Sequence, residues 1–147
     1  MESPWGAAVC AGGIAQAIKL VLAFARPAPL GLRAFLSLPG MPSTWAAVCA
    51  ALCAAVWRAE GLDSPVLAAV TTFSCLVLYD ALRLRRSAGG HARLLNAVAR
   101  DLQLHRPGAA RQHLRELLGE TPAQVLVGVA LGVAVGLPWP LAVTAGR

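Results

Sequence analysis

Hydrophobic positions gather into four long stretches, which are separated by segments rich in proline, glycine or arginine. At a rise of about 1.5 Å per residue, an α-helix of roughly 20 apolar residues spans the hydrocarbon core of a bilayer. The pattern therefore predicts an all-α integral membrane bundle of about four transmembrane helices, within a single domain that covers residues 1–147. The predicted spans are residues 5–25, 42–57, 65–82 and 122–143.

The segment between the third and fourth stretches, residues 83–121, has a different pattern. It carries eight arginines against three acidic residues, and Leu94, Leu95 and Val98 recur at helical spacing opposite Arg93. Amphipathic helices of this kind lie in the plane of the membrane interface. We therefore expect an amphipathic basic segment on one membrane face.

Small residues recur every fourth position in two of the predicted spans. Such spacing places them on one face of a helix and allows a neighbouring helix to approach closely, because no bulky side chain separates the backbones. We predict close helix packing at both stripes, which would also suit a helix–helix oligomer. The stripes are Ala46, Ala50 and Ala54 in the second span, and Gly128, Gly132 and Gly136 in the fourth.

The composition supports a membrane protein and excludes several other classes. Hydrophobic residues make up 57% of the chain and charged residues 14%, against about a quarter in soluble domains. The net charge of +6 lacks the interleaved aromatic residues of a nucleic-acid surface, so no nucleic-acid partner is expected. The four cysteines have no metal-ligand spacing. We therefore expect membrane lipids as partners and no metal or cofactor.

The distribution of arginine predicts the orientation of the chain. The loop after the first span and residues 83–121 share one side and hold ten arginines, whereas the other side has Arg58 and Arg147. Cytoplasmic loops are enriched in Lys and Arg, so the arginine-rich side should face the cytoplasm and both termini the outside. The first stretch lacks a preceding basic region and should be a retained helix. A bacterial inner membrane fits best, and a plastid membrane is the alternative.

The segment Pro39–Trp45 has the features of a tight turn that leads into a helix. Gly40 permits the turn, Pro42 fixes φ ahead of the helix, and Ser43 or Thr44 can cap its free N–H groups. In the predicted topology this turn, Lys19 and the arginine-rich segment meet at one membrane face. Because a helix N-terminus attracts anions, the convergence suggests an anion site, with an ordinary helix cap as the alternative.

A series of short motifs resembles one protein family. The motifs are Ala15-Gln16 with Lys19; Gly40-Met41-Pro42-Ser43; Tyr79-Asp80-Ala81 with Arg85-Arg86 and Ala88-Gly89; Leu95-Asn96; and Glu116-Leu117-Leu118-Gly119 with Thr121-Pro122 and Val125. They cover about residues 13–138, and in order and spacing they resemble the divergent branch of the type 2 phosphatidic acid phosphatase and vanadium haloperoxidase superfamily.

The resemblance implies a set of phosphate-binding residues. The wider superfamily holds phosphate oxygens with a lysine followed, after six residues, by Arg-Pro, and this chain has Lys19 and Arg26-Pro27 at that spacing. Chance spacing and snorkelling of Lys19 to the headgroups are together an equal alternative to phosphate binding. The residues expected to bind phosphate or another anion are Lys19, Arg26, Ser43, Thr44, Arg85 and Arg86.

The chain departs from the family pattern at the positions that carry its chemistry. Trp45 and Glu120 stand where the branch has histidines, and an indole carries no proton that titrates near neutrality. Gln124 replaces the glutamate that would orient the second histidine, and Arg83 replaces a glycine. The resemblance thus implies the fold and leaves the reaction in doubt.

His91 is a weak candidate for the missing nucleophile. Its distance from Arg85 copies the arginine-to-histidine spacing of the superfamily's third motif, but Leu84 and Leu95 occupy that motif's serine and aspartate positions. An interfacial role is the better interpretation of His91. For Asp80, we expect a local ion pair with Arg83 or Arg86 rather than a role as a base.

Two classes of function remain open. One is a catalytically degenerate membrane protein that keeps a cytoplasm-facing pocket for an anion or a lipid phosphate. The other is an active membrane phosphatase that hydrolyses a lipid or small organic phosphate ester.

Overall fold

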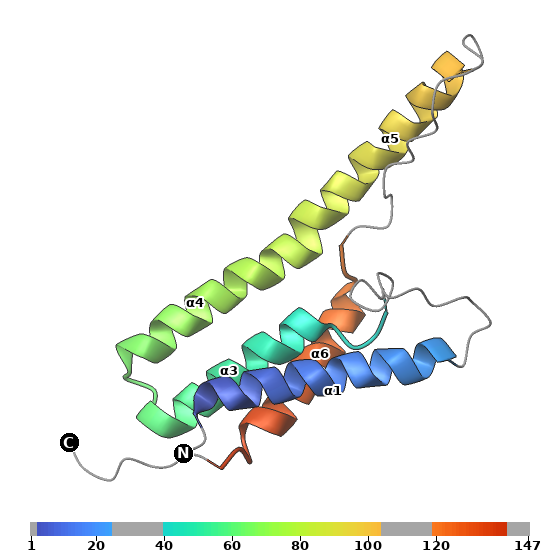
Figure 1. Ribbon diagram of the computed structural model, residues 1–147. Coiled ribbons are helices and arrows are strands. Elements are labelled where there is room, and N and C mark those ends of the chain that lie inside the picture. The colour runs from blue at the N-terminus through green and yellow to red at the C-terminus, as the bar shows by residue number, and fades with distance from the viewer. Residues whose placement is uncertain (1–2, 25–39, 104–118, 141–147) are drawn as a thin grey trace. The chain divides into compact units, whose positions relative to one another are not determined.

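The computed structural model describes residues 3–24, 40–103 and 119–140, and all regular structure within them is helical (Figure 1). The prediction of an all-α protein is therefore confirmed. The described residues form two compact units, one drawn from residues 1–78 and 122–147 and the other from residues 79–121. The helices are α1 (Pro4–Phe24), α3 (Thr44–Glu60), α4 (Pro65–Tyr79), the π-helical turn η1 (Asp80–Leu84), α5 (Arg85–Gln103) and α6 (Pro122–Gly136).

The core of the first unit is formed by α1, α3 and α6, which lie side by side (Figure 1). The contact between α3 and α6 is the most extensive, and the two predicted small-residue stripes make it. A Cβ atom built on Gly132 would lie 2.3 Å from the carbonyl oxygen of Ala47 and 2.8 Å from the Cβ of Ala50. The prediction of close packing at these stripes is therefore confirmed, and the two stripes pack against each other.

Alanines also form the contact between α1 and α3. Each of the six residues at its centre is completely buried, so the helices meet with little more than backbone and methyl groups between them. Interfaces of small residues are typical of helices that pack in a membrane, where van der Waals contact replaces the hydrophobic effect. The six are Ala7, Ala11 and Ala15 of α1 with Ala47, Ala51 and Ala55 of α3.

Helix α4 is exposed along most of its length. Ser74 is its one residue classed as buried, whereas Phe73 and Leu76 are 68% and 61% exposed. Exposed large apolar side chains in such number suit a surface that faces lipid. Among the described residues, two helical stretches are long and apolar enough to cross a membrane, Pro4–Ala23 and Pro65–Ala99.

Of the three core helices, α3 and α6 are shorter than α1. With 17 and 15 residues, α3 and α6 extend roughly 25 and 22 Å at about 1.5 Å per residue. Helix α6 ends at Gly136, earlier than the predicted boundary at residue 143. Both helices fall short of a hydrocarbon core of about 30 Å, a mismatch that local thinning of the bilayer can accommodate.

The third helix continues past its predicted boundary at Leu82. It passes through the π-helical turn η1, in which the Arg85 N–H donates to the Asp80 carbonyl, and runs on as α5 to Gln103. Neither proline nor glycine interrupts the chain between Pro65 and Gly89, so nothing in the backbone stops the helix there. The polarity changes near residue 83 while the helix persists. The placement of residues 83–121 on the membrane surface stays a prediction.

Candidate anion site at the N-terminus of α3

The N-terminus of α3 is capped by Ser43, one of the two residues predicted for that role. The Ser43 Oγ accepts a hydrogen bond of 3.1 Å from the Ala46 N–H, and the backbone at Ser43 is extended, as a cap requires. The Ser43 N–H donates to the Gln124 carbonyl at 3.0 Å. Ser43 is 1% exposed. The cap therefore also joins the first turn of α6 to the start of α3.

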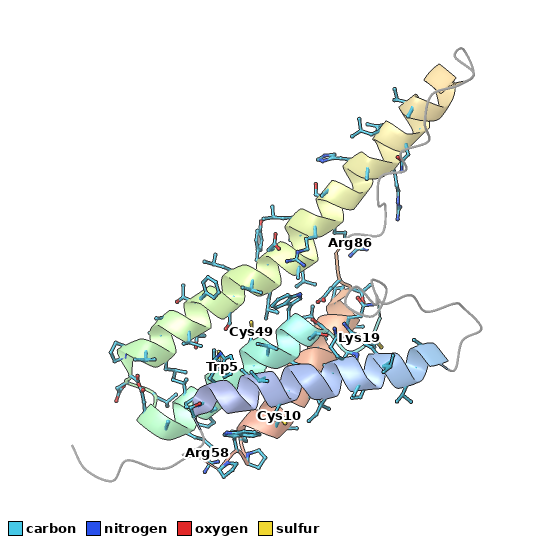
Figure 2. All side chains as sticks on the ribbon, in the orientation of Figure 1. Trp5, Cys10, Lys19, Cys49, Arg58 and Arg86 are labelled. Atoms are coloured by element: carbon cyan, nitrogen blue, oxygen red, sulfur yellow. The ribbon has the colours of Figure 1, made fainter. Side chains whose placement is uncertain are left out.

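Lys19 of α1 lies against this same helix end. Its Nζ donates a hydrogen bond of 2.9 Å to the Thr44 Oγ1, which in turn donates to the Gln16 Oε1 at 3.3 Å. Figure 2 shows Lys19 pointing from α1 toward the start of α3. Gln16 and Lys19 are three residues apart and therefore share a helix face, and both are hydrogen-bonded to Thr44. Lys19 is thus held by a hydrogen bond against the start of α3.

This arrangement combines two features that attract anions. The first turn of a helix presents N–H groups without intrahelical partners, and the aligned peptide dipoles leave a partial positive charge there. Lys19 adds a full positive charge beside the first residue of α3. Lys19, Ser43 and Thr44 were predicted to bind an anion, whereas Gln16 and the Gln124 carbonyl were not assigned to the site. The three-residue spacing of Gln16 and Lys19 was the available clue.

The other predicted anion-binding residues are not part of this cluster as described. Arg26 lies outside the described residues. Arg85 and Arg86 are exposed residues of the second unit. Their convergence with Lys19 on one site stays a prediction.

In the second unit, the predicted partner of Asp80 was wrong. Asp80 pairs with Arg85, Oδ2 to Nε at 2.7 Å, and not with Arg83 or Arg86. The cause is the π-helical turn. Its hydrogen bonds join residues i and i+5, so Arg85 is brought next to Asp80 one turn earlier. The side chains of Asp80 and Arg85 are 39% and 48% exposed, and ion pairs with such exposure contribute little to stability.

Gly119 and Glu120 pack tightly against this turn. The Glu120 N–H donates to the Ala81 carbonyl at 3.0 Å. Gly119 has a φ of +93°, and a Cβ atom there would lie 2.7 Å from the Arg86 nitrogen, so both conformation and space require glycine. Among the described residues, Glu120 Oε2 is buried and accepts no hydrogen bond.

Comparison with known proteins identifies the family. The family model described as "Divergent PAP2 family" matches residues 2–135. The chain belongs to the divergent PAP2 family. A relative is the "Uncharacterized membrane protein YuiD" of Bacillus subtilis (strain 168), 31% identical over 133 residues and covering 84% of each chain. No solved structure matches. The predicted resemblance is thus confirmed, and this family member is a membrane protein.

For this member of the family, the residues at the expected histidine positions have distinct surroundings. Trp45 follows Thr44 in the first turn of α3 and is 53% exposed. Glu120 is the residue held against the π-helical turn of the second unit. His91 is exposed on α5, where the neighbouring motif positions Leu84 and Leu95 are 57% and 56% exposed. No group of three or more His, Cys, Asp or Glu residues suited to a metal occurs in the described parts of the chain.

Proposed function

We propose that this divergent PAP2 family protein binds the phosphate group of a membrane lipid or another phosphate-bearing ligand at the N-terminus of α3. We further propose that it does not hydrolyse that ligand by a phosphohistidine route. The observation that carries the first part is the 2.9 Å hydrogen bond from Lys19 to Thr44, which fixes an ammonium group beside a capped helix N-terminus.

The physical basis for binding is a fixed cation together with backbone donors. Hydrogen bonds between charged groups contribute roughly 1.5–3 kcal/mol each, and the helix N-terminus contributes about 0.3–1 kcal/mol for an exposed anion. These contributions are electrostatic, so binding is weak for free phosphate and decreases as salt rises. A lipid phosphate should bind more tightly than free phosphate, because the lipid is already confined to the same membrane face as the site. In the predicted topology this face is cytoplasmic, in a bacterial inner membrane.

The argument against phosphohistidine catalysis rests on two side chains, Trp45 and Glu120. The phosphohistidine route needs a nucleophile with an available lone pair and an acid that protonates the leaving oxygen. Trp45 can supply neither, and Glu120 would bring a carboxylate toward an anionic substrate. Loss of general acid catalysis alone typically costs a factor of about 10² to 10⁴ in rate.

The second candidate function is an active membrane phosphatase with His91 as nucleophile. It requires His91 to be oriented by a hydrogen-bonding partner, as catalytic histidines are. The motif positions that would supply such partners are the leucines at 84 and 95. The degenerate protein is therefore the better supported of the two.

Binding can be tested by titrating purified protein in detergent with phosphate and vanadate, using tryptophan fluorescence as the readout. Trp45 is adjacent to Thr44 and should report on the site. We expect Lys19→Gln to weaken binding by roughly tenfold or more, which corresponds to loss of one charged hydrogen bond. Arg93→Gln is the control, because it removes the same charge from an exposed position of α5 that was not predicted to bind an anion. Equal affinity of Lys19→Gln and wild type would refute the proposed site.

A further inference from the structure

A second feature of the first unit is an apolar groove between α3, α4 and α6. Its volume is about 400 Å³, within the range of ligand pockets. Cys49, Cys53 and Trp57 line it from α3, Thr71 from α4 and Val133 from α6. Figure 2 shows Cys49 on the side of α3 that faces α4. The groove is separate from the anion site.

The separation follows from helix geometry. At about 100° per residue, Cys53 is nine residues from Thr44 and points to the opposite face of α3. Thr44 contacts Lys19 of α1, whereas Cys53 contacts Ser74 of α4, Sγ to Oγ at 3.4 Å. A ligand in the groove would therefore not reach Lys19 across the body of α3.

The polar atoms that border the groove are paired with one another. Ser74 Oγ contacts Cys53 Sγ, and Thr71 Oγ1 donates to the same sulfur at 3.9 Å, a weak interaction. Cys49, Trp57 and Val133 present sulfur, aromatic and hydrocarbon surface to the groove. An apolar cavity does not retain water, so hydrocarbon should fill this one in a bilayer.

The chemistry of the groove favours a phospholipid as its occupant. Its lining is apolar, and Arg58 follows the lining residue Trp57 at one end. A phospholipid joins a hydrocarbon chain to a phosphate, so one molecule would match both the apolar lining and the cation.

One end of the groove lies beside a cation. Leu137 lines the groove, and its carbonyl accepts a hydrogen bond from Arg58, the residue that follows Trp57. The same Nη1 atom donates to the Trp139 carbonyl at 3.2 Å. A guanidinium carries five N–H donors, and those on the other nitrogens can meet a phosphate. We propose that the groove holds one acyl chain of a bilayer phospholipid, with the phosphate at Arg58.

Native mass spectrometry of the full-length protein tests this proposal. Detergent-purified protein is incubated with a palmitoyl-oleoyl phosphatidylethanolamine and, separately, with glycerophosphoethanolamine, which has the same headgroup and no acyl chains. In Lys19→Gln, which removes the proposed anion site, we expect one phospholipid per chain and no adduct with the headgroup alone. Lys19→Gln should retain the phospholipid, so failure of the anion site and failure of the groove are distinguishable.

Adjacent threonines of α4 provide a matched pair of variants. Thr71 lines the groove, whereas Thr72 is exposed outside it and bonds its own helix, Oγ1 to the Ala68 carbonyl at 2.8 Å. Thr71→Phe should reduce the phospholipid adduct about tenfold, because overpacking of this kind typically weakens binding by a factor of about 5 to 150. Thr72→Phe should leave the adduct unchanged. Cys53→Phe, from the opposite wall, should repeat the loss if Thr71→Phe does not fold.

Three results would overturn the proposal. They are no adduct with wild type, equal adducts for Thr71→Phe and Thr72→Phe, and a wild-type dimer that Thr71→Phe converts to monomer. The last would assign the groove to a second copy of the chain.

Discussion

Replacing Gly132 with alanine adds one methyl group at the closest approach of α6 to α3. The new Cβ atom would lie 2.3 Å from the Ala47 carbonyl oxygen and 2.9 Å from the Ala51 nitrogen. Both neighbours are backbone atoms of a helix and cannot rotate away. The two helices must therefore separate by about 1 Å, which also loosens the contacts of Gly128 and Gly136 on the same stripe.

Two opposing contributions determine how much Gly132→Ala changes the free energy of unfolding. Overpacking a close contact costs about 1–3 kcal/mol, whereas alanine has a higher helix propensity than glycine by roughly 1 kcal/mol. We therefore expect Gly132→Ala to lower the free energy of unfolding by up to about 2 kcal/mol. Gly13→Ala is the control, because a Cβ atom there meets none of the described residues within 4 Å. It should be neutral or stabilising by up to about 1 kcal/mol.

The assay is equilibrium unfolding in mixed micelles of a mild detergent with increasing sodium dodecyl sulfate, followed by far-UV circular dichroism. The midpoint should shift to lower dodecyl sulfate for Gly132→Ala and stay constant or rise for Gly13→Ala. If the two variants had the same midpoint, the small-residue packing of α3 on α6 would not be the contact that holds the first unit together.

Three further predictions concern the cap, the ion pair and the orientation. Ser43→Ala should lower the free energy of unfolding by about 1 kcal/mol in the same assay, because the Ala46 N–H loses its partner; no change would contradict the cap. Asp80→Asn should change it by less than about 1 kcal/mol, since the Asp80–Arg85 pair is partly exposed; a larger loss would show a structural role for the pair. A cysteine introduced in place of Gln112, which lies outside the described residues, should resist an impermeant thiol reagent added to intact cells, and its modification would reverse the predicted orientation.

The helix packing was predictable because it follows from residue size and spacing. Small residues recur at intervals of four in two spans, as Ala46 and Ala50 in one and Gly128 and Gly132 in the other. In membrane helices such stripes are typical of close helix–helix contacts. The end of the third helix was not predictable in the same way. Polarity rises at residue 83, but polarity marks the membrane boundary and does not end a helix that lacks proline or glycine.

The candidate site was predictable where local rules apply. The capping role of Ser43 follows from its position before an apolar run, and the shared face of Gln16 and Lys19 follows from helical spacing. The partner of Asp80 was not predictable, because it depends on the π-helical turn at residues 80–84. Such a turn adds one residue to the helical repeat and leaves no recognisable pattern in a single sequence.

The central claim is that this divergent PAP2 family protein binds phosphate without phosphohistidine chemistry. The most direct test is a phosphatase assay of the purified protein, run beside a Trp45→His, Glu120→His double variant with a phosphatidic acid and a soluble aryl phosphate as substrates. The account predicts no vanadate-sensitive turnover by the wild-type protein. Rapid, vanadate-sensitive hydrolysis by the wild type that disappeared in His91→Ala would contradict the account and identify His91 as the nucleophile.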